Sequence, residues 1–320
     1  VLDGYSFSQG SESTDVTITE AGATPSRGSK RFTDSLPPAE WSFGTYVRPF
    51  VHGAASYRTA LDHDCVENIM WAALAGTALP GDADAGASGR GVEVGTTAQN
   101  GSIVDFEESD VHELMKLNLY FALENTTYRL NDAQINTAEI DFSIDGIAQI
   151  TWSGNATTID QISTDFDDPS KYRIEAFDAD GASLTHATGS TDTYVEGYNY
   201  ADTTGPSDAD YLRNKLSTLY LDADAQGGGS GSGGLDNKTY AINITGGSIS
   251  IENNVTYVTP ETIGIVDKPI GSFTGARTIS GSLTMYLDDK TDGSNQLLTD
   301  LAAATDIVTN EFDMRLFMGV

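Results

Sequence analysis

Alternation of apolar and polar residues with a period of two runs through several long stretches of this chain. It is clearest at residues 137–152, TAEIDFSIDGIAQITW, where apolar residues alternate with acidic, amide and hydroxyl side chains and Ile147 is the one exception. Residues 276–288, ARTISGSLTMYLD, repeat the scheme with threonine and serine opposite larger apolar residues. Alternation over this length predicts β-sheet with one dry face and one wet face. The expected fold class is mainly β, a β-sandwich or barrel with few short helices.

Other elements are placed by composition and by turn residues. Further strands are expected at residues 41–51, 113–123 and 240–252, and a Gly-Gly pair shifts the phase within the last of these. Helical spacing is found at residues 57–74, with Gly76 as a stop, and short surface helices are expected at residues 208–219 and 294–304. We expect a single domain of residues 1–320, with long loops or insertions at about 76–102 and 160–236.

The chain is strongly acidic. It carries 47 Asp and Glu against 17 Lys and Arg, a formal net charge of -30 at pH 7. Such a chain repels nucleic acid, because binding to phosphates needs clustered basic residues. Two explanations stay open: an acidic outer surface that keeps the protein soluble, or an acidic surface that must not bind a polyanion.

Cysteine usage and hydropathy exclude two further features. Cys65 is the one cysteine, so an intramolecular disulfide cannot form. No window of 18 uninterrupted apolar residues is present, so no membrane insertion is expected. The first residues, VLDGYSFSQGSES, lack a basic region followed by an apolar one, and no secretory signal is expected.

The signatures of common active sites are absent or incomplete. The stretch DADG at residues 178–181 resembles the turn of an EF-hand loop, but alanine occupies the first and last ligand positions. His112 and Glu113 begin like a zinc-protease motif, but Lys116 stands where the second histidine belongs. Five loop acids could offer calcium ligands, but a solvated acidic loop is the favoured explanation for them: Asp82, Asp84, Asp165, Asp167 and Asp168. We therefore expect no enzyme, no catalytic residue, no metal and no cofactor.

Three stretches resemble the tail tube proteins, or major tail proteins, of long-tailed bacteriophages. They are residues 30–50, KRFTDSLPPAEWSFGTYVRPF, residues 140–154, IDFSIDGIAQITWSG, and residues 248–287, which precede a short helix. None of them is a catalytic signature, so the resemblance rests on their order and combination.

This resemblance implies a structural virion protein. Members of the family form hexameric rings that stack into a hollow tail tube, which conducts double-stranded DNA during ejection. The inner sheet of each subunit joins those of its neighbours into a closed barrel, which removes exposed sheet edges. The implied partners are other copies of the chain, the tail terminator and distal tail proteins, and the tape measure protein and genomic DNA, which pass through the lumen without specific binding. The implied location is the virion tail, assembled in the cytoplasm of the bacterial host.

On this interpretation the wall strands are residues 113–123, 137–152, 240–252 and 276–288, and their wet face lines the lumen. The expected lumen-facing residues are Glu139, Asp141, Ser143, Asp145, Gln149, Glu252, Thr278, Ser280, Ser282 and Thr284. Lys116 and Arg277 are the basic residues nearest this face, and Arg277 falls in the apolar set, so its side chain should point away from the channel. The lumen is expected to be net negative; the alternative is that the acid lies mainly outside, for solubility.

Two other classes of protein stay open from the sequence alone. One is a secreted β-sandwich adhesin or carbohydrate-binding module, which would need an export signal. The other is a glycoside hydrolase with two carboxylates in a cleft. In a tube, the polar loops 76–102 and 160–236 are expected to face outward or to bridge neighbouring rings, because a channel of fixed width has no room for them.

Overall fold

The structure is a computed structural model that describes most of the strand-forming sequence. The described residues are 4–19, 22, 27–51, 63–65, 67–76, 90–93, 103–106, 114–123, 126–162, 211–224, 238–260, 268–303 and 311–318. They form mainly β structure with few short helices, which confirms the predicted fold class.

The chain divides into two compact units. Unit 1 takes the described residues of 1–138, 151–209 and 251–278, and unit 2 takes those of 139–150, 210–250 and 279–320. Four of the described strands contribute residues to both units, namely β10 (Thr126–Ser143), β11 (Gln149–Ala156), β15 (Ile244–Glu252) and β18 (Thr278–Met285).

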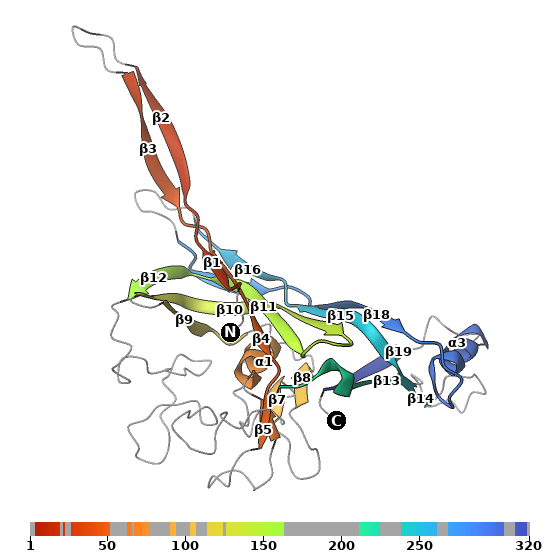
Figure 1. Cartoon of the computed structure of the whole chain (residues 1–320). Helices are drawn as coiled ribbons and strands as arrows, with labels where there is room; N and C mark the ends of the chain where they lie inside the picture. Colours follow the sequence, from red (N-terminus) through yellow and green to blue (C-terminus); the bar gives the residue numbers. More distant parts are fainter. Residues whose placement is uncertain are drawn as a thin grey trace. The chain divides into compact units, whose positions relative to one another are not determined.

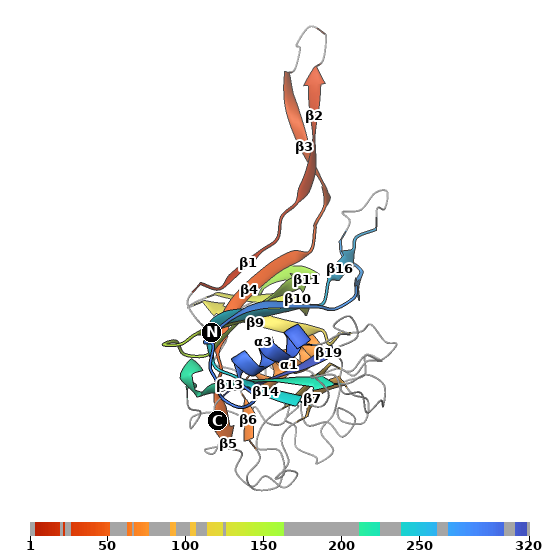
Figure 2. The same cartoon turned by 90° about the vertical axis from the view of Figure 1, so that its right-hand side faces the viewer.

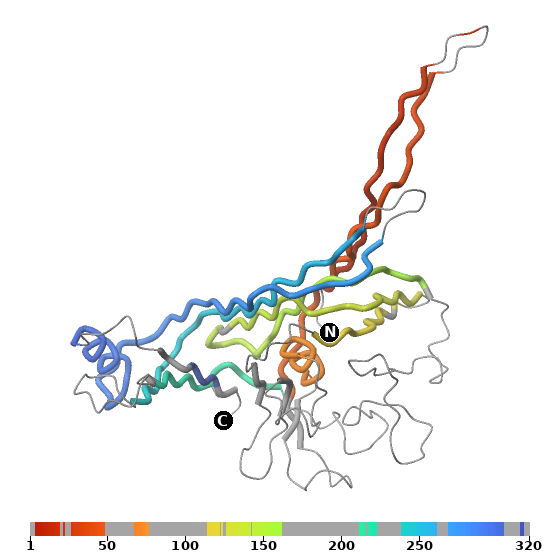
Figure 3. The backbone as a smooth tube through the Cα atoms, turned by 180° about the vertical axis from the view of Figure 1, so that it is seen from behind, coloured from red at the N-terminus to blue at the C-terminus, as the bar shows by residue number. Residues whose placement is uncertain are grey.

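The largest sheet has eight strands (Figure 1). Its order is β1 (Ser6–Ser8), β4 (Ala39–Tyr46), β11, β10, β15 and β18 (Thr278–Met285), while β9 (Leu117–Leu123) and β12 (Thr158–Ile162) also pair with β10. β18 ends this series, so one backbone edge of β18 has no partner strand in the described part of the chain. Figure 3, which views the chain from behind, shows β15 and β18 side by side.

The described residues of unit 1 also form helix α1 (Asn68–Ala75) and four two-stranded sheets. The pairs are β2 (Glu12–Thr19) with β3 (Arg27–Ser35), β5 (Pro49–Val51) with β6 (His63–Cys65), β7 (Arg90–Glu93) with β8 (Ile103–Phe106), and β16 (Val255–Val258) with β17 (Gly271–Thr274). Figure 2 shows β2 and β3 extending as a ribbon beyond β1 and β4 of the same unit. We call this ribbon of β2 and β3 the arm.

The helix of unit 1, α1 (Asn68–Ala75), is apolar on nearly every side and is therefore a core helix. Its Trp71 ring meets the fully buried Trp152 of β11 edge-on, with 4.9 Å between ring centroids. Gly76 ends it as predicted and donates its N–H to the Ala72 carbonyl at 3.0 Å. The prediction of a helix over 57–74 is wrong for His63–Cys65, which pair with β5 as strand β6. Residues 57–62 lie outside the described part.

Glu67, directly before α1, is a buried acid with incomplete partners. Its side chain is 1 % exposed; Oε2 accepts the Arg48 backbone N–H at 3.2 Å, and Oε1 lies 3.8 Å from Arg48 Nε without a hydrogen bond. Burial raises the pKa of this carboxyl to about 7, and the Arg48 N–H and charge offset only part of that effect. The folded state therefore holds a proton that the unfolded chain has already lost, between the ordinary glutamate pKa and about pH 7.

We expect this acid to make stability fall as pH rises. The contribution is fully present below the unfolded pKa and is lost as pH rises through about 7, at a cost of about 3 kcal/mol above it. Glu67→Gln should leave urea unfolding at pH 5 almost unchanged and should stabilise the protein at pH 8 by about that amount. Glu139→Gln, at an exposed acid, is the matched control; the same pH dependence in both variants would contradict the assignment to Glu67.

Unit 2 packs helix α3 (Ser294–Ala303) on a three-stranded sheet of β14 (Lys238–Ile242), β13 (Ser217–Asp224) and β19 (Glu311–Met318) (Figure 2). Its core consists of Leu219, Tyr240, Ile242 and Leu297. α3 confirms the helix predicted at 294–304. Asp300 on its buried side accepts hydrogen bonds from Tyr240 Oη at 2.8 Å and Lys238 Nζ at 2.7 Å, which fasten α3 to β14.

The helix predicted at 208–219 is wrong. The described part of that stretch holds a 3₁₀ turn, η3 (Asn214–Leu216), after which β13 begins at Ser217. β13 pairs with β14 on one side and with β19 on the other, and these distant strands outweigh the local helical spacing.

Candidate functional site

The end of β10 carries the predicted wet face of unit 2. Glu139, Asp141 and Ser143 are exposed, while Ile140 between them is 6 % exposed and packs inward. At the start of β11, Gln149 is exposed and Ile150 is fully buried. The alternation therefore separates a dry side from a polar side bearing two carboxylates, as its period requires.

Residues 137–152 are not the single strand that was predicted. β10 ends at Ser143, a turn follows, and β11 begins at Gln149. The turn is closed by Gly146 N–H donating to the Ser143 carbonyl at 2.9 Å. Ile147, the exception to the alternation, falls in this connection rather than in a strand. Asp145 is also in the turn, exposed and 3.8 Å from Lys215 Nζ, so it does not belong to the strand face.

β18 is exposed on both faces. Its hydroxyl residues Thr278, Ser280, Ser282 and Thr284 are exposed, as predicted for the wet side. On the opposite side Ile279 is 57 % and Met285 39 % exposed, and Leu283 packs against the core of unit 2. This strand thus presents a partly uncovered apolar side together with an unpaired backbone edge, which a partner strand or chain would satisfy.

Two glycines let β15 and β18 of unit 2 approach each other closely. Gly247 has φ +147°, a conformation that favours glycine, and a Cβ there would overlap the Ser282 carbonyl of β18. Gly281 on β18 faces the Ser248 carbonyl of β15 in the same way. The Gly-Gly pair predicted as a phase shift is the point where β15 meets β18 backbone to backbone.

Arg277 lies in unit 1 and its contacts hold it inside the protein. Its Nε donates to Asn253 Oδ1 at 2.9 Å and its Nη2 to the Ala75 carbonyl at 3.1 Å. Asn253, only 2 % exposed, donates to the Leu74 carbonyl at 2.9 Å. The Arg277 guanidinium and the Asn253 amide therefore donate hydrogen bonds to the last two carbonyls of α1, which lack partners within the helix. Of the other predicted residues at this face, Glu252 is partly exposed and Lys116 is exposed.

Unit 1 has a polar face that the sequence did not reveal. Ser6 pairs with Ser42 and Ser8 with Glu40, which places all four on one face of β1 and β4. They line an open pocket of about 320 Å³ together with Trp41, Asn136, Ser153, Gly154 and Asn155. The alternation in β1 spans only Ser6–Ser8, too short a pattern to be recognised in the sequence.

The arm has two unlike faces. Cross-strand pairs place Thr14 with Phe32, Val16 with Lys30, and Ile18 with Gly28 on one face. The other face carries Asp15 paired with Arg31, Thr17 with Ser29, and Ser13 with Thr33. Val16 is 47 % and Phe32 51 % exposed, so the first face is an apolar surface that nothing in the described part of unit 1 covers. A two-stranded ribbon is marginal in water by itself, which indicates a covering partner.

The described residues contain no cluster of histidine, cysteine, aspartate or glutamate able to hold a metal ion. The loop acids considered as calcium ligands, and the EF-hand-like residues 178–181, lie outside the described part. Within that part, no helix has the length and apolar character that crossing a bilayer requires.

In the described residues, the structure shows a mainly β protein with an open sheet edge along β18 and an exposed apolar face on the arm. The phage tail tube protein family matches residues 20–315, and the chain belongs to this family, whose members are components of the virion tail. The chain is also 35% identical over 325 residues to the tail tube protein pb6 of Escherichia phage T5. That alignment covers 100% of this chain and 58% of the phage T5 protein, so the chain spans a little over half of its relative's length. The family predicted from the three sequence stretches is confirmed.

Proposed function

We propose that this chain is the wall subunit of a tail tube, in which hexameric rings stack into a hollow cylinder. The tape measure protein and then double-stranded DNA pass through the lumen without specific binding. Tail terminator and distal tail proteins occupy the two ends of the tube. Assembly takes place in the cytoplasm of the host, and no step of this role requires catalysis. The family match favours this role over an adhesin, a carbohydrate-binding module or a glycoside hydrolase.

The observation that carries the proposal is that β18, within the described residues, has an unpaired backbone edge and exposed apolar residues. A strand with an unpaired edge and exposed apolar residues, here Ile279 and Met285, invites aggregation unless another chain completes the sheet. A ring satisfies every such edge at once, because each subunit offers the same edge to its neighbour. The hydroxyl side chains of β18 and the carboxylates of β10 then stay exposed to solvent, as the wall of a water-filled channel requires.

Negative-stain microscopy of the purified protein tests this role. We expect rings about one subunit thick, or tubes built of them, and a subunit stoichiometry of six by mass measurement of the rings. Isolated globules at every salt and protein concentration, also after addition of short tube fragments as initiators, would contradict the proposal.

We propose further that the apolar face of the arm docks on a second copy of the chain in the next ring. The evidence is the exposure of Val16 and Phe32, and the position of Lys30 on the same face of the arm while the chain as a whole carries a net charge of -30. The predicted role of loops 76–102 and 160–236 outside the lumen or between rings stays a prediction.

Phe32→Asp should block stacking while leaving the subunit folded, because the side chain is exposed in the subunit and buried only on docking. The protein concentration needed for tubes should rise at least about tenfold, the equivalent of losing part of one buried aromatic contact per subunit. Thr33→Asp places the same charge on the opposite face of the same strand and should assemble normally. Sedimentation of tubes over a concentration series measures both; equal losses in the two variants would exclude docking by the apolar face.

A further inference from the structure

The arm joins the body of unit 1 through two short links without strand pairing. The β1–β4 ladder ends at the pair Ser8 and Glu40, and the β2–β3 ladder begins at the pair Glu12 and Ser35. Between the two ladders lie residues 9–11 on the outgoing leg and 36–39 on the returning leg. Such a gap between ladders is where a ribbon can swing, because no backbone hydrogen bonds of either ladder cross it.

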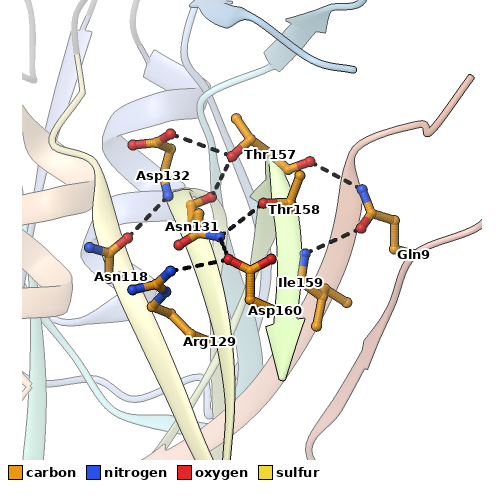
Figure 4. A network of polar contacts seen from close by, with 9 residues as sticks. All are labelled: Gln9, Asn118, Arg129, Asn131, Asp132, Thr157, Thr158, Ile159 and Asp160. Carbon is orange, nitrogen blue, oxygen red and sulfur yellow. Dashed lines mark hydrogen bonds and ion pairs between the residues drawn. The ribbon is translucent and has the colours of Figure 1, made fainter. Parts of the chain in front are cut away.

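The side chain of Gln9 bridges this gap, and Figure 4 shows its contacts with Thr157 and Ile159. Its Nε2 donates to the Pro37 carbonyl at 3.0 Å, on the returning leg, and to the Thr157 carbonyl at 3.1 Å, directly before β12. Its Oε1 accepts the Ile159 backbone N–H at 3.2 Å. Both donor positions and the acceptor of the amide are therefore in use, and all three partners are backbone groups.

The side chain of Gln9 contacts β12 in the way that the backbone of a neighbouring strand would. The carbonyl of Thr157 and the N–H of Ile159 are two residues apart, the spacing that one residue of a neighbouring parallel strand would contact. Gln9 thus covers the start of the free edge of β12, while the other edge of β12 pairs with β10.

The start of β12, which Gln9 contacts, is held to β10 by further polar contacts (Figure 4). Thr157 N–H donates to the Asn131 carbonyl at 2.9 Å, and Asn131 Nδ2 donates to Asp160 Oδ2 at 2.7 Å. Arg129 of β10 adds an ion pair to the same Asp160 at 3.1 Å. The returning leg is stiffened as well, because Pro37 and Pro38 have fixed φ angles.

From these contacts we propose that Gln9 is the positioning residue that fixes the direction in which the arm leaves unit 1. Its hydrogen bonds connect both legs of the arm to β12, which is itself held by β10, so the arm keeps one orientation before it docks. Docking of a fixed arm avoids the entropy that ordering a swinging arm would cost. The consequence for assembly rests on the proposed function, whereas the effect on the arm's direction does not.

Spin labels test the direction of the arm in the isolated subunit. One label replaces Thr17 on the polar face of the arm and one replaces Thr151 on β11, in a Cys65→Ser background, at a protein concentration below that of assembly. Gln9→Glu keeps the length of the side chain but removes both donors, and Gln9→Ala removes the whole amide. We expect the distribution of label-to-label distances to broaden in both variants and to stay narrow in Gln161→Ala, at an exposed glutamine of β12.

Each outcome decides one part of the proposal. Distributions as narrow as in the parent protein for Gln9→Glu and Gln9→Ala would overturn the positioning role. Broadening with a roughly tenfold rise in the concentration needed for tubes supports both the role and its use in assembly. Broadening with unchanged assembly supports the positioning by Gln9 and removes the arm from the proposed function. If Gln9→Ala does not fold, Gln9→Glu gives the same readings.

Discussion

Gly247→Ala is expected to destabilise unit 2 severely and to abolish tube formation. Two costs add at this position. The backbone φ of +147° is strained for any residue with a Cβ, and that Cβ would overlap the Ser282 carbonyl of β18. Strain and overpacking together amount to about 3–5 kcal/mol, unless β18 moves away from β15. Either response removes the edge strand that we propose joins neighbouring subunits.

Gly271→Ala is the matched control, since Gly271 of β17 has open space where the new Cβ would lie. We expect that variant to be as stable as the parent protein or slightly more stable, because glycine is the more flexible residue in the unfolded chain. Urea unfolding gives the free energies and microscopy gives the assembly. A Gly247→Ala protein as stable as Gly271→Ala would show that β15 and β18 do not meet as described.

The sequence predicted those parts of the fold in which one long local pattern decides the structure. Alternation along residues 137–152 identified the exposed residues Glu139, Asp141 and Ser143, because a period of two forces neighbours to opposite faces whatever the topology. The same alternation passed through the turn at Gly146, since a hairpin connection can preserve the order of polar and apolar residues. Period alone therefore could not locate the turn.

Features that depend on distant partners were not predictable from local patterns. The helix predicted at residues 208–219 overlaps β13 at residues 217–219, and pairing with β14 and β19 makes these residues part of a strand. Gln9 and Asn253 look like ordinary polar residues in sequence, although each satisfies backbone groups that are far away along the chain. Residues 30–35 of the arm belong to a stretch that was used only for the family resemblance, and no strand was predicted for them. The two faces of the arm follow only from the strand register in the structure.

In the tube that we propose, with Asp141 facing the lumen, Asp141→Lys is expected to turn a channel that does not bind DNA into one that does. In a hexameric ring the change replaces six negative charges by six positive ones, and stacked rings repeat it along the whole channel. Each lysine that reaches a phosphate releases counterions, so affinity for double-stranded DNA should rise at least about tenfold at low salt. The logarithm of that affinity should fall with the logarithm of salt concentration, with a slope of about -0.9 for each added contact.

Genome ejection from phage particles carrying the variant gives the decisive reading. Ejection should be slow at low salt and should recover at high salt, while Asp141→Asn, which adds no cation, should eject normally. Asp289→Lys makes the same charge change at an exposed acid between β18 and α3, outside the predicted lumen face. Because DNA meets only the channel wall, this control should change ejection little even if it binds free DNA. Equal slowing by Asp141→Lys and Asp289→Lys would place the acid of β10 outside the channel, so that the negative charge would serve solubility rather than the passage of DNA.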